Sequence, residues 1–184
     1  MTVDTCYDLA SLTKVLATTT ALALLMQRGL VKVDDRIDDI LTELRGSASG
    51  GATVRQLLTH SSGLPGWRPY YERVAAAEAT QPGFLGSPAA SETLLQCIAK
   101  EELVYERGSR SLYSDLGFML LGFAVERLSG EPLDQFCSGR LYGPLGARPL
   151  AYARRGSASA LSIHHDGACT IAPTEEDPWR KRML

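Results

Sequence analysis

A serine and a lysine three positions apart, Ser11 and Lys14, have the types and spacing that nucleophilic chemistry needs. On a helix this spacing places the two side chains one turn apart on the same face. A serine hydroxyl is a poor nucleophile near neutral pH unless a base takes its proton. A lysine can be that base if burial disfavours its ammonium form and lowers its pKa. The pair is therefore a candidate nucleophile and base.

The element that must position this pair is a helix predicted over residues 9–28, LASLTKVLATTTALALLMQR, with Asp8 capping its start and Gly29 ending it. Its body is apolar on nearly every face and carries only one charge, that of Lys14. We therefore expect the helix to be buried all round, which would lower the pKa of Lys14. The dipole at the helix start acts in the same direction, and free backbone N–H groups there could stabilise an oxyanion.

The spacing alone has an ordinary explanation. Ser-x-x-Lys should arise by chance roughly once in a few hundred residues of average composition. A serine in the first turn of a helix is also a common local cap. Other residues must therefore decide between chemistry and accident.

A second group, Tyr113-Ser114-Asp115, opens a helix predicted over residues 113–128, which Ser129-Gly130 should end. The Tyr113 phenol could relay a proton near Lys14, and the Asp115 carboxylate could bond to Lys14 or to a substrate amide. The alternative is that Tyr113 is a half-buried aromatic residue and Asp115 is an acid favoured by the helix dipole.

The other predicted elements are short helices joined by long loops. Thr53 is expected to cap a helix over residues 54–60, and Ser91 one over 92–100. Residues 66–90, which contain several prolines and glycines, are predicted as a loop. A helix started by proline is expected within residues 131–146. No run of strand-like segments long enough for a sheet is present.

Composition fits one globular domain: the chain has 184 residues, 45% of them hydrophobic, and a net charge of -2. This charge gives no reason to expect nucleic acid or an anionic membrane as a partner. The four cysteines show no Cys-x-x-Cys or Cys/His ligand pattern, so we expect no metal site. A chain this long can build a core without cross-links, so we also expect reduced thiols. The N-terminus does not resemble a signal peptide and no segment is long enough to span a bilayer, so a cytoplasmic protein is expected from the sequence as written.

Three segments in order resemble the β-lactamase-related serine hydrolases, which include class C β-lactamases, DD-peptidases of the penicillin-binding type and small-molecule esterases. They are DLASLTK at 8–14, LLTHSSGLP at 57–65 and YSDLGFMLLG at 113–122. APTEEDPWR at 172–180 also resembles the esterase-like branch. Three ordered motifs are far more specific than any one of them.

The resemblance implies roles for individual residues. Ser11 would be the acylated nucleophile, Lys14 its activating base, and Tyr113 the partner base that activates water for deacylation. Asp115 would contact substrate at a position where the family usually has asparagine. Its charge should raise the pKa of Lys14 and shift more of the base role to Tyr113. His60 is expected to anchor a loop along the cleft, without acting as a base.

The family's third motif, Lys-Thr-Gly or His-x-Gly on a strand, has no clear counterpart. His165-Asp166-Gly167 matches His-x-Gly literally but lies in a loop-like stretch, and it precedes the 172–180 segment that the motif should follow. We therefore expect His165 not to serve as a third-motif residue.

The resemblance also implies the fold, which is α+β in the full family. This chain is expected to be mostly helical, a partial domain over 1–184 truncated at both ends, with most of the central sheet missing. Its predicted parts are a nucleophile helix region (1–30), a helical subdomain with cleft loops (31–146) and a loop-rich tail (147–184).

Three functions are compatible with the sequence. The first is a serine hydrolase that acts on small-molecule esters or amides, including β-lactam-like ones, through an acyl-enzyme, with no metal or organic cofactor. The second is a truncated, catalytically incompetent homologue that at most binds a ligand or partner. The third is an all-helical interaction domain in which the Ser-x-x-Lys spacing is accidental. The sequence does not distinguish a lactam, a peptide or an ester as substrate, and it leaves the oligomeric state open.

Overall fold

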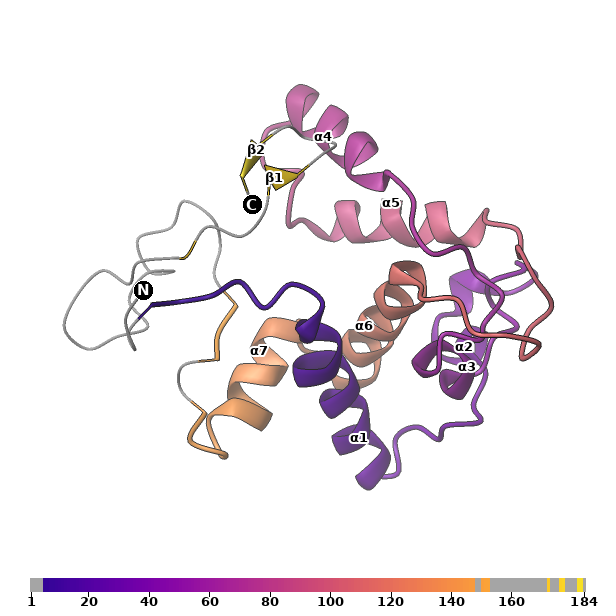
Figure 1. The fold of residues 1–184 in the computed structure, drawn as a ribbon, viewed down its shortest axis with the longest axis horizontal. Helices are drawn as coiled ribbons and strands as arrows, with labels where there is room; N and C mark the ends of the chain where they lie inside the picture. The colour runs from indigo at the N-terminus through magenta and orange to yellow at the C-terminus, as the bar shows by residue number, and fades with distance from the viewer. Residues whose placement is uncertain (1–4, 148–149, 153–171, 173–175, 178–181, 184) are drawn as a thin grey trace.

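The computed structural model describes residues 5–147, 150–152, 172, 176–177 and 182–183 (Figure 1). Helices make up most of this part. In chain order the elements are η1 (Lys14–Thr19), α1 (Thr20–Gln27), α2 (Ile37–Ile40), η2 (Thr42–Leu44), α3 (Val54–Leu58), α4 (Tyr70–Thr80), α5 (Pro88–Ala99), α6 (Asp115–Ser129), α7 (Leu133–Cys137), η3 (Ser138–Tyr142), β1 (Glu176–Asp177) and β2 (Arg182–Met183).

The predicted N-terminal helix is present as η1 followed directly by α1, but it begins at Lys14 and not at Leu9. Asp8 does not cap it, because a turn with Ala10 at φ +43° precedes the helix. Asp8 stands before it and accepts a hydrogen bond from the Ala10 N–H at 2.8 Å. The η1 turn is π-helical, and the Thr19 and Thr20 hydroxyls donate to carbonyls five residues back, at 2.8 and 2.9 Å. These side-chain bonds match the wider π register and help to explain it. Gly29 follows the helix with φ +72°, a left-handed conformation that suits glycine.

The expectation that this helix is buried on every face is wrong. Ala21 and Leu22 are fully buried, whereas Leu12 and Val15 are 57% and 61% exposed. The helix packs on α6 and α7, which lie beside it in Figure 1. Within the described residues no element covers the face that carries Leu12 and Val15.

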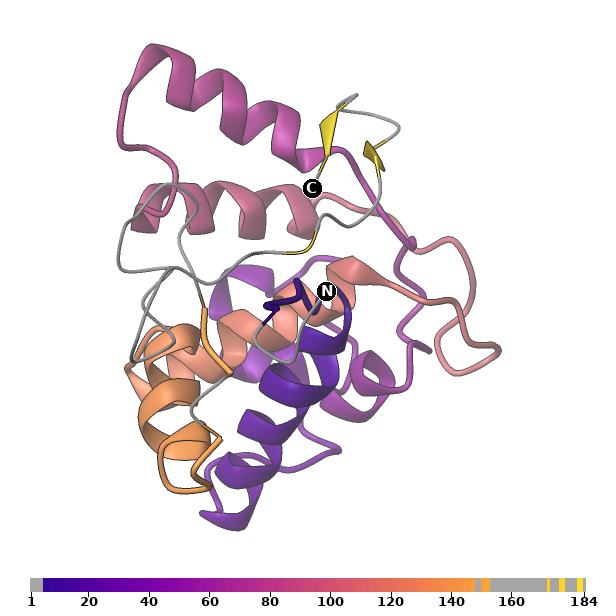
Figure 2. The same ribbon diagram turned by 60° about the vertical axis from the view of Figure 1, so that its left-hand side comes forward.

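The main core lies between α1, α2, α3 and α6, with α6 at its centre. Its fully buried side chains include Leu22, Leu25, Leu57, Leu120 and Leu121. A smaller cluster of Val74, Phe84 and Ala90 joins α4 to α5, which run side by side at one end of the molecule (Figure 2). The core therefore fixes α6 and the continuous η1–α1 helix, and these elements position the candidate site.

Two predicted helix caps are confirmed. The Thr53 hydroxyl accepts the Gln56 N–H while the Gln56 side chain accepts the Thr53 N–H, a capping box that starts α3. At α6, Gly130 ends the helix in the left-handed conformation with φ +73°. These local signals are strong because they satisfy backbone groups that the helix leaves unpaired.

Two other boundaries differ from expectation. Helix α5 begins at Pro88 with Ser87 as its cap, one turn before the predicted Ser91, because proline suits the first turn of a helix. Residues 70–80, expected to lie in a loop, form α4. The segment YYERVAAAEAT is rich in alanine and carries an early glutamate, both of which favour a helix. The proline-started helix is present as α7, followed directly by the π-helical turn η3.

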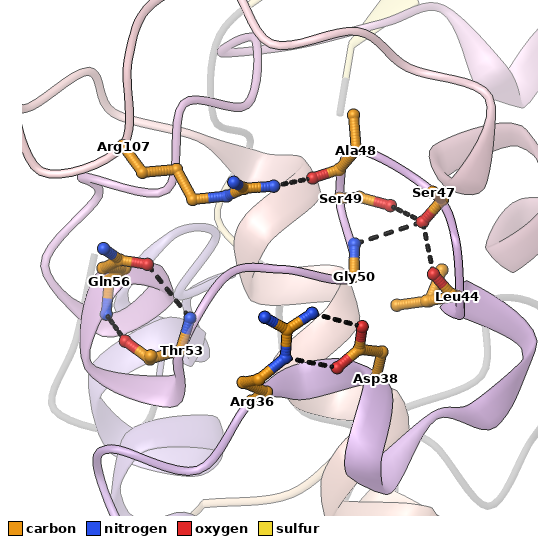
Figure 3. A network of polar contacts seen from close by, with 10 residues as sticks. All are labelled: Arg36, Asp38, Leu44, Ser47, Ala48, Ser49, Gly50, Thr53, Gln56 and Arg107. Atoms are coloured by element: carbon orange, nitrogen blue, oxygen red, sulfur yellow. Dashed lines mark hydrogen bonds and ion pairs between the residues drawn. The ribbon is translucent and has the colours of Figure 1, made fainter.

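A polar network holds the connection between α2 and α3, and Figure 3 shows it closely. The Arg36 guanidinium donates two hydrogen bonds to the Asp38 carboxylate, at 2.9 and 2.7 Å. The Ser47 hydroxyl donates to the Leu44 carbonyl at 2.6 Å. Arg107, from the loop that leads to Tyr113, donates to the Ala48 carbonyl. This last bond attaches the loop that precedes Tyr113 to the connection between α2 and α3.

The described strands are limited to β1 and β2, which pair antiparallel over two residues each. The mostly helical character predicted from the sequence is confirmed for the described residues. None of the described helices has the length and hydropathy required to cross a membrane.

Two described cysteines, Cys97 and Cys137, are free and buried, as expected. Cys6 is disulfide-bonded, so the expectation of reduced thiols is wrong for this residue. It lies outside the helical core, in a segment whose Cys6 carbonyl accepts a hydrogen bond from the Ala172 N–H at 2.9 Å. We expected reduced thiols because a large core can hold the fold together without cross-links. That reason does not apply to Cys6, which lies in a segment outside the core.

Candidate active site

Ser11 lies in the turn that leads into η1. The Lys14 N–H donates to the Ser11 carbonyl at 3.0 Å, which closes the turn. Ala10, the residue before Ser11, has φ +43°. A left-handed conformation costs an alanine roughly 1–2 kcal/mol. Such strain persists where surrounding structure holds it, often at functional sites, and here it sets the position of the exposed Ser11 side chain.

The predicted contact between serine and lysine is present. Lys14 Nζ lies 3.3 Å from Ser11 Oγ and donates to it. The Lys14 side chain is 17% exposed, so it is largely but not completely removed from water. The two side chains meet across the turn that leads into η1, so the contact that their spacing predicts forms without Ser11 lying in the helix.

The start of α6 approaches the same lysine from a distant part of the chain. Asp115 Oδ1 lies 2.7 Å from Lys14 Nζ. Two bonds hold the α6 start in place: the Asp115 N–H donates to the Gly66 carbonyl at 2.8 Å, and the buried Ser114 hydroxyl donates to the Pro65 carbonyl at 2.7 Å. The same hydroxyl accepts the Gly117 N–H at 3.2 Å and so caps α6.

Aromatic rings form the rest of the surroundings of Lys14. Its Nζ lies 5.0 Å from the centroid of the Tyr113 ring and 5.9 Å from that of Phe118. Ring faces attract cations at such distances. The Tyr113 side chain is half exposed and is therefore open to a substrate.

The pKa of Lys14 reflects opposing effects. Burial lowers it, but hydrogen bonds with Asp115 and Tyr113 and the charge of Asp115 together raise it above its ordinary value. The expectation of a pKa lowered by burial is therefore wrong, because that argument considered only the helix itself. The expected effect of Asp115 is confirmed. Lys14 is an ammonium at neutral pH.

Most backbone N–H groups near Ser11 are engaged. Those of Leu12 and Thr13 donate to the carbonyls of Leu9 and Ala10, at 2.8 and 3.1 Å. Fewer backbone N–H groups are therefore free at the start of the helix than the sequence predicted, because the tight turn before the helix uses them. Within the described residues the N–H of Ser11 itself is left as the candidate oxyanion donor.

His60 lies against Tyr113 and Ser114, closer to the candidate catalytic residues than the sequence indicated. Its Nδ1 accepts a hydrogen bond from the Ser114 N–H at 3.1 Å, and its ring centroid lies 4.5 Å from that of Tyr113. The motif at 57–65 indicated that this histidine anchors a loop, but nothing in the sequence indicated which residue it contacts. His165 lies outside the described residues. Among the described side chains no group of three or more potential ligands has the arrangement of a metal site.

Known proteins are similar to this chain in sequence and in fold. The family model described as β-lactamase matches residues 1–171. A protein of Escherichia coli (strain K12), provisionally described as a D-alanyl-D-alanine carboxypeptidase, is 41% identical over 151 residues, which make up 79% of this chain and 33% of that protein. The chain spans about a third of the length of the curated relatives it matches.

Two solved structures share the fold. The D-alanine carboxypeptidase AmpC from Burkholderia cenocepacia aligns with 100% of this chain and 42% of its own, with a TM-score of 0.68 at 19% identity. A class C β-lactamase from Rhodobacter sphaeroides aligns with 97% of this chain and 46% of its own, with a TM-score of 0.64 at 25% identity. The three ordered motifs, the family match and the shared fold agree, and the chain belongs to the β-lactamase family of serine hydrolases.

Proposed function

We propose that this chain carries the acyl-transfer chemistry of its family, the hydrolysis of an ester or amide through an acyl-enzyme on Ser11. One observation carries the proposal: Lys14 Nζ lies 3.3 Å from Ser11 Oγ and 2.7 Å from Asp115 Oδ1. A nucleophile and a cation that are neighbours in sequence thus meet a carboxylate from a distant part of the chain. A purely accidental Ser-x-x-Lys spacing gives no reason for the third residue to join them.

The proposed reaction has two halves. In the first, Ser11 Oγ loses its proton to a base and attacks the substrate carbonyl carbon. The new C–O bond forms as the C–N or C–O bond to the leaving group breaks, and the leaving group takes up the proton. In the second, water attacks the acyl carbon, the bond to Ser11 breaks and the free acid is released.

Tyr113 is the proposed base in both halves, because an ammonium cannot accept a proton. Lys14 Nζ lies 5.0 Å from the centroid of the Tyr113 ring, and its positive charge can offset the negative charge that develops on oxygen during attack. Asp115 keeps that charge in place. In this arrangement Lys14 stabilises charge and orients Ser11, while Tyr113 moves the proton.

A second candidate is a homologue that binds a ligand or is acylated but does not turn over. The observation that favours it is coverage, because the chain spans about a third of the length of its curated relatives. The names of those relatives suggest peptides ending in D-alanine as substrates to test, beside β-lactams and simple esters.

A labelling experiment tests the proposal. The folded chain is incubated with a fluorescent fluorophosphonate and, separately, with a fluorescent penicillin, and the modified residue is identified by peptide mass spectrometry. We expect one adduct on Ser11 that is absent in Ser11→Ala and present in Ser87→Ala, a control remote from the site. Release of label over time, with hydrolysis of p-nitrophenyl acetate or a D-alanyl-D-alanine peptide, distinguishes turnover from stable acylation. No labelling of a sample that melts cooperatively, or labelling retained in Ser11→Ala, would sink the proposal.

A further inference from the structure

His60 has an unusual backbone conformation for a residue with a side chain. Its φ is +56°, and Ala10 and His60 are the only residues other than glycine with positive φ in the part of the chain that the structure describes. Histidine tolerates the left-handed region better than most residues, but the conformation is still uncommon. One of the two residues precedes Ser11 and the other lies against Tyr113. Both strained positions therefore lie at the same site.

His60 forms hydrogen bonds with both sequence neighbours of Tyr113. The His60 carbonyl accepts the Leu112 N–H at 2.8 Å and the Tyr105 hydroxyl at 2.9 Å. The imidazole Nδ1 accepts the Ser114 N–H at 3.1 Å. One residue thus binds the backbone just before and just after Tyr113, and the left-handed φ lets its carbonyl and its ring both reach that segment.

The ring of His60 also supports the phenol directly. It lies 4.5 Å from the Tyr113 ring and 5.1 Å from the Phe118 ring, tilted by 37° in each case. Tilted aromatic pairs at such distances are attractive. The half-buried His60 imidazole therefore packs against the half-exposed Tyr113 side chain.

The hydrogen bond fixes the protonation state of this imidazole. An Nδ1 that accepts an N–H bond carries no proton, so the ring is neutral with its proton on Nε2. The titratable groups that face it are Lys14 from η1, Asp115 from α6, and Tyr105 and Tyr113 from the loop. Burial and the positive charge of Lys14 lower the pKa of His60, while the charge of Asp115 opposes them.

We infer that His60 is a positioning residue for Tyr113: its neutral imidazole holds the Tyr113–Ser114 backbone and ring in place, and its protonation releases them. The inference rests on the proposed function of Tyr113 as a base. A proton on Nδ1 would turn the acceptor into a donor facing the Ser114 N–H, so the bond is lost. Acylation of Ser11 should then decline on the acid side of neutrality as His60 titrates.

Two substitutions separate this role from simple packing. His60→Asn places an amide oxygen where Nδ1 lies and is tolerated at positive φ, so it keeps the acceptor but cannot titrate. His60→Gly keeps the backbone conformation and removes both the acceptor and the ring. The double variant His164→Asn, His165→Asn controls for the two other histidines of the chain.

The test measures fluorophosphonate labelling of Ser11 from pH 5 to pH 9 alongside nitrogen NMR of the histidine rings, with the His60 signals assigned by their absence in His60→Asn. We expect an acidic limb in the labelling rate whose midpoint matches the His60 titration and lies below the ordinary histidine value of 6.5. His60→Asn should label at neutral pH within about threefold of the unmodified chain and lose that limb. His60→Gly should label about tenfold more slowly, the effect of losing one hydrogen bond of average strength. The control should keep the limb.

Three results would overturn the inference: unchanged labelling in His60→Gly, an acidic limb that persists in His60→Asn, or an NMR signal that places the proton on Nδ1. If no form of the chain is labelled, the proposed function fails, and the ring signals still decide whether His60 holds the turn. In that case a Ser114 amide signal that does not shift as His60 titrates contradicts the positioning role.

Discussion

The Lys14 ammonium lies 2.7 Å from the Asp115 carboxylate, and this ion pair joins the first helical turn of the chain to the start of α6. The lysine side chain is 17% exposed and the aspartate 39%, so the pair lies at the edge of the protein where a substrate can reach it. Because Lys14 also donates to Ser11 Oγ, a single cation connects the candidate nucleophile with Asp115 at the start of α6.

Replacing the carboxylate by the amide usual in the family should weaken the charge stabilisation that Lys14 provides. In Asp115→Asn the pKa of Lys14 should fall, since the hydrogen bond to a carboxylate and its charge both raise it now. The neutral amine fraction at a fixed alkaline pH then grows about tenfold for each pKa unit. Because the proposed role of Lys14 needs the ammonium form, we expect labelling of Ser11 to slow, and its decline at alkaline pH to begin at a lower pH than in the unmodified chain.

Asp134→Asn is the matched control, because Asp134 is also an acid in the first turn of a helix, α7. It should leave the labelling profile unchanged. Faster labelling in Asp115→Asn near neutral pH would show that the neutral Lys14 amine acts as a base, and would contradict the prediction.

The α6 cap should matter for both stability and chemistry. Ser114→Ala removes a buried hydroxyl that caps Gly117 N–H and donates to the Pro65 carbonyl, so we expect a loss of about 1–2 kcal/mol in the free energy of unfolding. Labelling of Ser11 should slow as well, since Ser114 lies between Tyr113 and Asp115. Urea unfolding and labelling rates measure the two effects.

Ser87→Ala is the comparison for that variant. Ser87 caps α5 in the same way, accepting the Ala90 N–H at 3.3 Å and donating to the Phe84 carbonyl at 2.6 Å. It should lower stability by about 1 kcal/mol with labelling unchanged. Equal labelling rates in the two variants would show that the α6 cap has no part in positioning the site.

The Arg36–Asp38 pair in Figure 3 should make stability depend on pH. Hydrogen bonds from the Arg36 guanidinium hold the pKa of Asp38 below its ordinary value of 3.8. A carboxyl with a lowered pKa stabilises the fold above that value and loses its contribution as pH falls through the folded pKa. Asp38→Asn should therefore cost about 1–2 kcal/mol at pH 7 and progressively less below pH 3.8.

Asp34→Asn provides the exposed counterpart. Asp34 also binds an arginine, Arg55, through two hydrogen bonds, but its side chain is 73% exposed. Water and salt screen such a pair, so little change in unfolding is expected. A cost for Asp38→Asn that stays constant from pH 7 to acid would contradict the assigned role of its carboxylate.

Gly63, in the loop after α3, should tolerate no side chain. Its φ is +86°, and a Cβ there would lie 2.7 Å from the Tyr105 carbonyl oxygen, a backbone atom that cannot yield easily. We expect Gly63→Ala to cost about 2–4 kcal/mol from strain and overlap together. Gly83 has a similar φ of +91° with open space around its Cβ, so Gly83→Ala should cost only about 1 kcal/mol. Similar melting temperatures for the two variants would contradict this account.

The sequence by itself determined the local features of this protein. Three such features are the capping box at Thr53, the glycine that ends α6 and the contact between Ser11 and Lys14. Each depends on residues within four positions of one another. The three ordered motifs likewise determined the family. Even the effect of Asp115 on the pKa of Lys14 followed from the sign of one charge, once the resemblance indicated that the two residues meet.

Where sequence reasoning failed, the missing information was tertiary. Uniform apolarity over residues 9–28 predicted a helix buried all round, yet Leu12 and Val15 are exposed because burial depends on which elements pack against the helix. The net rise in the pKa of Lys14 could not follow from its own helix, since its causes come from Tyr113 and Asp115. The contact of His60 with Ser114 spans 54 positions and is created by the packing of α3 on α6. Local hydrogen bonds depend on residues that are neighbours in the sequence. The pKa of a side chain and its burial depend on every element that packs around it, and only the tertiary structure brings those elements together.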